Sequence, residues 1–309
     1  MIKELTTSYL NSLDAEDFKK LLLQDIFTDR LNEDSSDFFI KLIEYIYPLM
    51  EDIDKNQLSK LAIAASSFYN YILFIDKVVD RGIDHFENDS YKNRVIEATS
   101  AIELSTIELY SLFKNNLQFW EKYRIYKTQY FEAIFEERAI SSEKTIIDSI
   151  SFERIAKGKH ALAEFLVVSM FMLNKSELNT EHKERQVLKC VQNIFIAMQI
   201  YDDIEDFAED SENDIWTYPQ STLKELIDSE NIVLTEKQEH LKLQLFYVSG
   251  TAEDLLRYGL KKLNESKNIT TDLKLFQLES FIDGLIDKIG KKIELINTLI
   301  NRAKLKQQK

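Results

Sequence analysis

The stretch that decides the fold and its chemistry is Gln199-Ile-Tyr-Asp-Asp-Ile-Glu-Asp-Phe-Ala-Glu-Asp210. It directly follows the apolar segment 191–198, and on a helix Asp202 and Asp206 lie one turn apart on the same face. So many carboxylates in so short a segment repel one another unless water or a cation separates them. The stretch therefore predicts either a solvated helix face or a metal site at the end of an apolar helix.

Composition predicts one all-α domain over residues 1–309. Hydrophobic residues make up 44% of the chain, which is enough for a core, whereas 6 Gly and 2 Pro leave turns and strand boundaries scarce. The formal net charge of −14 argues against a nucleic-acid surface, because such a surface needs a basic footprint. The single cysteine, Cys190, excludes an internal disulfide and lies in an apolar helical pattern, where we expect a buried and inert thiol.

Hydrophobic periodicity and breaker residues predict where the helices lie. Pro48 should end the second helix, and Gly158 indicates a break in the sixth. The aromatic residues along 117–139 are expected to pack in the core, and His160 is interpreted as structural. The expected helices are 14–28, 36–47, 57–80, 91–113, 117–139, 141–173, 184–210, 235–263 and 271–300, with loops at 84–89 and 214–219.

A second acidic pair, Asp76 and Asp80, continues the buried face of the helix expected at 57–80. Carboxylates there are costly unless they are paired or bound to a cation. Oxygen donors at i and i+4 suit Mg²⁺, which keeps several waters and is often completed by substrate phosphates. Two such helices facing each other would hold a diphosphate through shared Mg²⁺ ions. Four basic residues are candidate direct phosphate contacts: Arg154, Lys157, Lys159 and Arg257.

These motifs resemble a known family. The segment Gln199 to Asp206 looks like the QIxDDxxD second aspartate-rich motif of trans-prenyl diphosphate synthases, and Asp76 to Asp80 resembles the DxxxD first motif of related enzymes. The resemblance covers roughly residues 60–260, and only the second motif is specific. It implies a class I isoprenoid synthase fold, a single helical bundle around a central cavity. It also implies three Mg²⁺ ions in the substrate complex.

The roles that the resemblance implies can be placed residue by residue. Asp76, Asp80, Asp202 and Asp206 would be the catalytic carboxylates, with Asp203 and Asp210 as further metal ligands. Diphosphate departure would leave an allylic carbocation, which an apolar pocket shields from water. The candidate pocket residues are Tyr69, Ile72, Phe165, Phe195, Met198 and Gln199.

The chain also departs from the elongating enzymes, because Arg81-Gly82 follows Asp80 where those enzymes carry an Arg pair. The early Gly-Lys-Arg segment that binds isopentenyl diphosphate is absent as well. We therefore expect a class I terpene synthase that cyclises a C15 or C20 prenyl diphosphate. The alternatives are a prenyltransferase, either head-to-head like squalene and phytoene synthases or chain-elongating, and a non-enzymatic helical interaction protein.

The expected partner is a small prenyl diphosphate, with no nucleic acid and no stable membrane insertion. The N-terminal residues Met1 to Thr6 show no signal-peptide pattern, and no uncharged apolar stretch is long enough to span a bilayer. We therefore expect a soluble cytoplasmic protein. Its oligomeric state is left open, although homodimers are frequent among the enzymes that it resembles.

Overall fold

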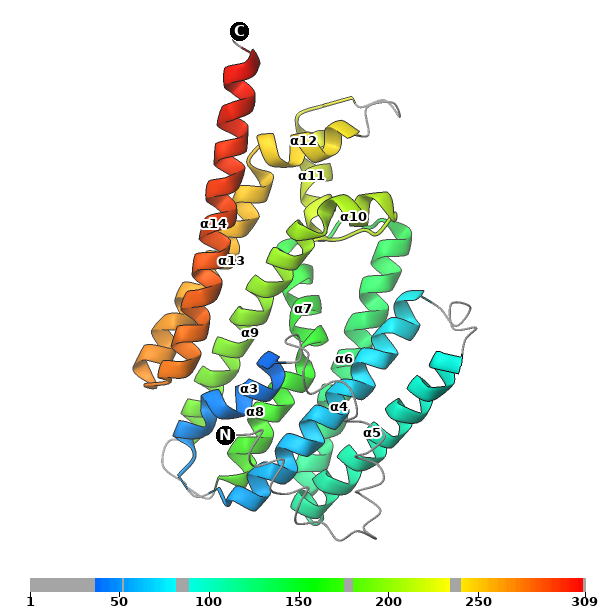
Figure 1. The fold of residues 1–309 in the computed structure, drawn as a ribbon, viewed down its shortest axis with the longest axis vertical. Helices are drawn as coiled ribbons and strands as arrows, with labels where there is room; N and C mark the ends of the chain where they lie inside the picture. Colours follow the sequence, from blue (N-terminus) through cyan, green and yellow to red (C-terminus); the bar gives the residue numbers. More distant parts are fainter. Residues whose placement is uncertain (1–36, 52, 82–88, 175–179, 234–239, 308–309) are drawn as a thin grey trace. The chain divides into compact units, whose positions relative to one another are not determined.

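The structure of the chain is a computed structural model, which describes all residues except 1–36, 52, 82–88, 175–179, 234–239 and 308–309. The described residues form α-helices and one 3-10 turn and contain no strand, which confirms the prediction of an all-α protein (Figure 1). The helix expected at 14–28 and most of the loop expected at 84–89 lie outside the described residues.

The chain divides into two compact units. Unit 1 comprises Met1–Lys127 and Leu162–Glu184, and unit 2 comprises Thr128–Ala161 and Arg185–Lys309. The prediction of one domain over 1–309 stays a prediction, and each unit is described by itself.

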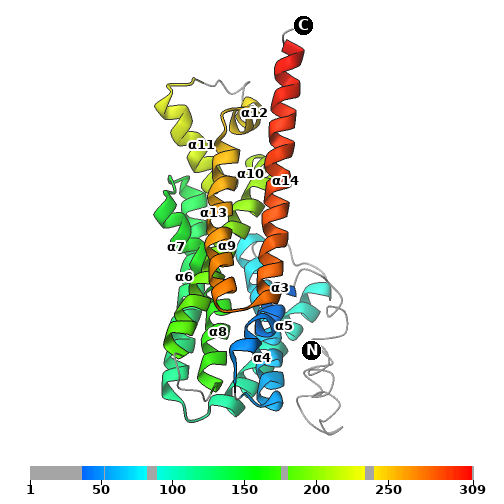
Figure 2. The same ribbon diagram turned by 90° about the vertical axis from the view of Figure 1, so that its left-hand side faces the viewer.

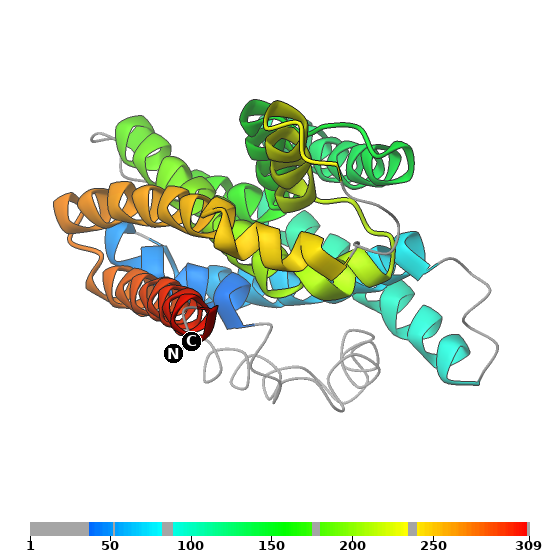
Figure 3. The ribbon, with the colours of Figure 1, turned by 90° about the horizontal axis from the view of Figure 1, so that it is seen from above.

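Unit 1 is built around the helical hairpin of α4 (Lys55–Arg81) and α5 (Asp89–Phe113), which run antiparallel side by side (Figures 1 and 3). α3 (Asp37–Ile46) packs on α4 and passes into the 3-10 turn Tyr47–Leu49, where Pro48 ends the helix as predicted. The other helical segments of unit 1 come from α6 (Leu117–Glu143), α8 (Ala161–Leu173) and α9 (Thr180–Glu205). In α8 every residue from Ala161 to Met170 is buried, as expected of a helix that is apolar on all sides.

One stretch of α4, Lys55–Ile75, is long and apolar enough to cross a membrane by length and composition alone. More than half of this stretch is buried inside the protein. A core helix has the same properties, so we interpret α4 as the central helix of unit 1.

Unit 2 contains α7 (Ser149–Lys159) and, after α9, the helices α10 (Phe207–Glu212), α11 (Tyr218–Ser229), α12 (His240–Val248), α13 (Thr251–Asp272) and α14 (Phe276–Gln307). α13 and α14 form an antiparallel pair (Figure 2). α9 lies close against α13: a Cβ on Gly259 would be 3.6 Å from the Cα of Ala197. Cys190 of α9 is fully buried and its Sγ lies 3.8 Å from the carbonyl oxygen of Ser266. Burial raises the pKa of this thiol to about 12.

Two helix predictions and one loop prediction are wrong in detail, and α11 lies where no helix was expected. The segment 141–173 breaks at His160, close to the break predicted at Gly158, and becomes α7 and α8. Its first residues, 141–143, belong instead to the end of α6. The segment 235–263 is interrupted at Gly250, whose φ of +93° lies in the left-handed region that glycine adopts without strain. The loop expected at 214–219 ends early, because Pro219 lies in the first turn of α11.

Candidate active site

The acidic stretch forms the end of α9 and the start of α10. The backbone N–H of Asp206 donates to the carbonyl of Asp202 at 2.9 Å, and that of Asp210 donates to the carbonyl of Asp206 at 2.8 Å. The chain bends at Asp206, which follows the last residue of α9 and is the N-cap of α10. Asp202 and Asp206 are one turn apart at the end of α9, and Asp210 lies in α10, beyond the bend. Asp202 and Asp206 are exposed and Asp210 is half-buried.

Asp203 is the buried member of this stretch, only 8% exposed. Its Oδ1 accepts a hydrogen bond of 2.6 Å from Nε2 of Gln199, one turn earlier on α9. Burial raises the pKa of Asp203 to about 7, the charge of Lys159 and the Gln199 hydrogen bond lower it, and the charges of Glu137 and Asp210 raise it further. Asp203 is therefore only partly ionised at neutral pH.

Burial and the neighbouring carboxylates also disfavour the ionised forms of Asp202 and Asp210. Burial raises the pKa of Asp210 to about 6, and the charges of Asp206, Glu209 and Glu137 add to that effect. Although the Asp202 side chain is exposed, neighbouring atoms partly desolvate its carboxyl group and raise its pKa, and the charge of Lys288 opposes this shift. Excess negative charge in one place is the electrostatic condition that a bound cation relieves.

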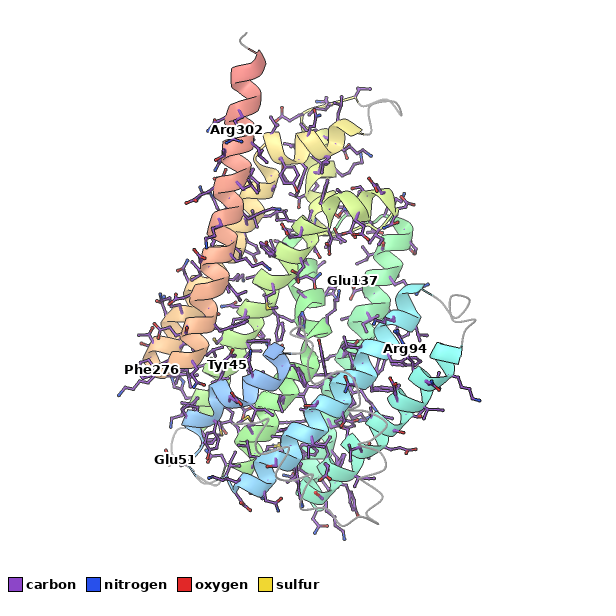
Figure 4. All side chains as sticks on the ribbon, in the orientation of Figure 1. Tyr45, Glu51, Arg94, Glu137, Phe276 and Arg302 are labelled. Atoms are coloured by element: carbon purple, nitrogen blue, oxygen red, sulfur yellow. The ribbon has the colours of Figure 1, made fainter. Side chains whose placement is uncertain are left out.

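A pocket of about 320 Å³ in unit 2 opens beside Asp203. Its polar lining comes from α6, α7 and α9, and its other walls are largely apolar and aromatic. Figure 4 labels Glu137, which α6 contributes. The lining residues are Glu137, Ile147, Phe152, Ile155, Ala156, Lys159, Gln199, Asp203, Trp216, Thr217 and Tyr218.

Lys159 is the basic candidate that the structure places in this pocket. It is the last residue of α7, and its Nζ lies 2.8 Å from Oε2 of Glu137 on α6. Gly158, just before it, packs tightly on α6, because a Cβ there would lie 2.5 Å from the Cβ of Ala133. His160, just after it, stacks on Phe195 of α9 with ring centroids 3.8 Å apart. The segment around Lys159 is thus packed on both sides.

The other basic candidates form ion pairs away from the pocket. Arg154 is exposed and pairs with Glu136. Lys157 lies 3.0 Å from Glu153, and Arg257 pairs with Glu253 on its own helix. The Oε1 atom of Glu153 also lies 2.6 Å from Nζ of Lys262 and accepts a hydrogen bond from the hydroxyl of Tyr258. Arg154, Lys157 and Arg257 are thus held in ion pairs with neighbouring acids, and their role as phosphate contacts stays a prediction.

The apolar candidates fall in both units. In unit 1, Tyr69 stacks on Phe39 with ring centroids 5.3 Å apart, and Ile72 is buried. Phe165 lines a mainly apolar pocket of about 320 Å³ in the same unit, together with Phe39, Leu61, Ala64, Ala65, Phe68, Ser105, Leu109, Tyr123, Leu162, Leu166 and Ser169. In unit 2, Phe195 is buried against His160. Met198 lines a different pocket from Gln199.

Asp76 and Asp80 belong to the last turns of α4. Their side chains lie outside the described residues. Their role as metal ligands stays a prediction, as does that of the four acids in unit 2.

Sequence reasoning missed several residues at the site. Trp216, Thr217 and Tyr218 lie six to eight residues beyond Asp210, and the two aromatic side chains were the signal that could have found them. Glu137 had no such signal, because a lone acid on an amphipathic helix is ordinary. Lys288, which lines a second pocket with Asp202, was equally inconspicuous.

Whether the carboxylates at the end of α9 can bind a divalent metal depends on how many protein ligands that metal needs. Among the residues that the structure describes, no three His, Cys, Asp or Glu side chains come close enough to hold a metal ion by themselves. Mg²⁺ does not need such a cage, since one or two carboxylates plus substrate phosphates commonly bind it. The exposed carboxylates of Asp202 and Asp206, one turn apart, fit that pattern.

Comparison with known proteins identifies the fold. No protein-family model matches the chain, and no curated protein matches its sequence significantly. Solved structures do match. Heptaprenyl diphosphate synthase from Staphylococcus aureus is similar with a TM-score of 0.70 at 14% identity, over 93% of this chain and 96% of that one. Decaprenyl diphosphate synthase from Rhodobacter capsulatus gives a TM-score of 0.69 at 14% identity, with the same coverage. Geranylgeranyl pyrophosphate synthase from Lactobacillus brevis gives 0.62 at 13% identity, over 93% and 95% of the two chains.

The resemblance to class I isoprenoid diphosphate enzymes is therefore confirmed at the level of the fold. The expectation of a terpene cyclase, and with it of a lyase, is wrong. The similar structures are prenyl diphosphate synthases, which favours the alternative of a prenyltransferase.

Proposed function

We propose that the protein is a Mg²⁺-dependent prenyltransferase that lengthens an allylic prenyl diphosphate with isopentenyl diphosphate. The observation that carries this proposal is the Gln199 to Asp206 motif at the end of α9, in a chain whose fold is that of prenyl diphosphate synthases over almost its whole length. The similarity of fold supports a prenyl diphosphate as the class of substrate, and the motif supports a diphosphate site at the end of α9.

Each residue at the end of α9 has a distinct part in this proposal. Asp202 and Asp206 offer exposed carboxylates to Mg²⁺, with Asp210 one turn further on. Asp203 is oriented by Gln199 and lies in the pocket of Lys159. Asp76 and Asp80 are proposed as the first metal-binding motif, on α4. When bound, Mg²⁺ would neutralise the diphosphate and make it a better leaving group.

Lys159 is the proposed direct phosphate contact. Its ammonium lies at the pocket wall beside Glu137 rather than on the open surface. A fixed cation there needs little reorganisation as negative charge develops on the departing diphosphate. Gly158 and His160 hold the backbone on either side of it.

The pocket in unit 1 is proposed to hold hydrocarbon. Its lining is almost wholly aliphatic and aromatic, with only the hydroxyls of Ser105, Ser169 and Tyr123 among the lining residues. Such a surface favours a hydrocarbon chain over a polar ligand. The similar structures make products of very different length by name, from geranylgeranyl to decaprenyl, so the fold leaves chain length open.

Radiolabelled isopentenyl diphosphate tests the proposal directly. Purified protein is incubated with Mg²⁺, labelled isopentenyl diphosphate and geranyl, farnesyl or geranylgeranyl diphosphate, and the dephosphorylated products are separated by chain length. A labelled prenyl alcohol longer than the primer supports chain elongation. An unlabelled hydrocarbon of doubled carbon number would instead assign a head-to-head transferase. No product above the Asp202→Asn control contradicts transferase activity altogether and leaves a helical interaction protein.

Location and assembly belong to the same proposal. An enzyme of soluble diphosphates needs no membrane insertion, and we propose a cytoplasmic protein that assembles as a homodimer. Fractionation of cells and light scattering of the purified chain measure these two properties.

A further inference from the structure

A second pocket lies on the other side of the end of α9 from Lys159. It contains Asp202 but none of the four basic residues that sequence reasoning selected. α13 and α14 close it, and its one cationic lining residue comes from α14. The lining residues are Ala197, Met198, Tyr201, Asp202, Leu263, Leu285, Lys288 and Ile289.

Lys288 of α14 is directed at this end of α9. Its Nζ lies 4.1 Å from the centroid of the Tyr201 ring, within the range of a cation–π interaction. Its charge is also the largest favourable charge interaction of the Asp202 carboxylate, ahead of that from Lys159. Lys288 therefore stabilises the ionised form of Asp202 without forming a close ion pair with it.

Lys292 lies one turn further along α14 and acts on the next acid. Its Nζ forms an ion pair with Glu205, the last residue of α9, and its side chain is only 21% exposed. Two lysines at i and i+4 thus face two acids on the final turn of α9. The C-terminal end of a helix carries partial negative charge, which favours cations in the same place.

Lys291 provides the contrast within the same helix. It is 72% exposed and pairs at 2.6 Å with Asp287 on α14 itself. All three lysines lie within two turns of α14. Lys288 and Lys292 differ from Lys291 because their side chains contact residues of α9, whereas that of Lys291 contacts its own helix.

We propose that Lys288 and Lys292 are built-in counter-cations of the acidic motif, and that they compete with a divalent metal for the end of α9. This inference rests on the proposed function, because it concerns the same metal site. A divalent ion at Asp202 meets the like charge of Lys288, so the lysine lowers the affinity for the metal alone. A diphosphate brings negative charge that can neutralise metal and lysines together. Metal and diphosphate then bind cooperatively, each raising the affinity for the other.

Binding of Mn²⁺ to the intact chain measures the competition without any need for activity. Free Mn²⁺ is followed by its electron paramagnetic resonance signal, with and without inorganic pyrophosphate. The set comprises the wild-type protein, Lys288→Gln, Lys292→Gln, the matched control Lys291→Gln, and Asp202→Asn to establish that the ion binds at the motif. Lys288→Arg restores the charge, and circular dichroism checks that each variant is folded.

The expected result is that Lys288→Gln binds Mn²⁺ alone about three- to tenfold more tightly, with a smaller gain from pyrophosphate. Lys292→Gln should shift in the same direction, whereas Lys291→Gln and Lys288→Arg should resemble the wild type. Equal affinity in Lys288→Gln and Lys291→Gln, or weaker binding in Lys288→Gln, overturns the inference. Wild-type binding that Asp202→Asn does not change overturns it too. Cooperative Mn²⁺ binding without prenyl transfer would refute the proposed function and leave the inference standing.

Discussion

In α9 the side-chain amide of Gln199 donates a hydrogen bond of 2.6 Å to the Oδ1 of Asp203, one turn further along the helix. The bond fixes the direction of a buried carboxylate and satisfies one of its oxygens. It also favours the ionised form, against the burial that raises the pKa of Asp203 to about 7. The balance between these two effects determines how the protein responds to pH.

The metal-free protein is expected to lose stability as the pH rises from about 5 to about 7. In the folded state the pKa of Asp203 is about 7, whereas an unfolded aspartate titrates near about 3.9. Folding therefore favours the protonated form, and this stability is complete below the unfolded pKa and lost as the pH rises through the folded one. The loss amounts to about 2 kcal/mol over this interval. Urea unfolding at a series of pH values measures it.

Two variants check the assignment of this pH dependence to Asp203. Asp203→Asn cannot ionise, so its stability should vary less over the same interval. Gln199→Leu removes the hydrogen bond to the carboxylate and should move the loss of stability to higher pH. An unchanged slope in Asp203→Asn would show that another group is responsible, with Asp210 the next candidate because its pKa is raised to about 6.

Lys159→Ala is expected to reduce the kcat/KM of prenyl transfer by about a hundredfold, the usual cost of losing one preorganised group that stabilises developing charge. Its ammonium lines the pocket of Asp203, and no other basic residue among those described does so. Steady-state kinetics with the allylic diphosphate varied measure the loss. Lys157→Ala is the matched control, two residues away and paired with Glu153. Equal losses in the two variants would contradict a direct role for Lys159.

Gly158→Ala is expected to destabilise the protein by about 1–3 kcal/mol, because the new methyl group overpacks the contact with Ala133 on α6. Chemical denaturation measures the change. Gly284→Ala is the control, because its Cβ would meet no atom within 4 Å and should stabilise α14 by about 0.5–1 kcal/mol. If Gly158→Ala were as stable as Gly284→Ala, α7 and α6 could not be packed as closely as described.

Phe68→Leu is expected to lengthen the product by one or more isoprene units. Phe68 is buried, lines the apolar pocket of unit 1 and lies edge-on to Tyr123 with ring centroids 5.9 Å apart. Removing its ring enlarges the pocket, and chromatography of the dephosphorylated products shows the change. Phe113→Leu removes an equally buried ring that stacks on Phe119 and does not line the pocket. A longer product from Phe113→Leu alone would place the prenyl chain elsewhere.

The sequence predicted long helices well because their signal is local. The apolar period and the scarcity of breakers placed α4, α5 and α6 within a few residues. The whole of α11 was missed: no helix was expected between residues 210 and 235, and Pro219 was interpreted as part of a loop. Pro is also favoured in the first turn of a helix, and Gln220 accepts a hydrogen bond from the backbone N–H of Thr217 in the manner of a capping box.

The candidate site was only partly predictable, because neighbouring residues on one helix face different partners. Arg154 and Lys159 look equivalent in sequence, yet they pair with Glu136 and Glu137, consecutive residues of α6 that point in different directions. Which of the two reaches the pocket depends on how α7 packs on α6. That packing depends in turn on contacts between residues distant in sequence, which no spacing rule contains.

The buried thiol of Cys190 makes this chain convenient for spectroscopy. It is the only cysteine of the sequence, and with its pKa raised to about 12 it carries almost no thiolate at neutral pH. Maleimide dyes and nitroxide labels should therefore leave the native protein unmodified. A cysteine placed on an exposed helix position, such as Thr106 or Lys261, can then be labelled selectively in the otherwise unaltered protein. Ligand binding could be followed from such a site with no need for a cysteine-free background.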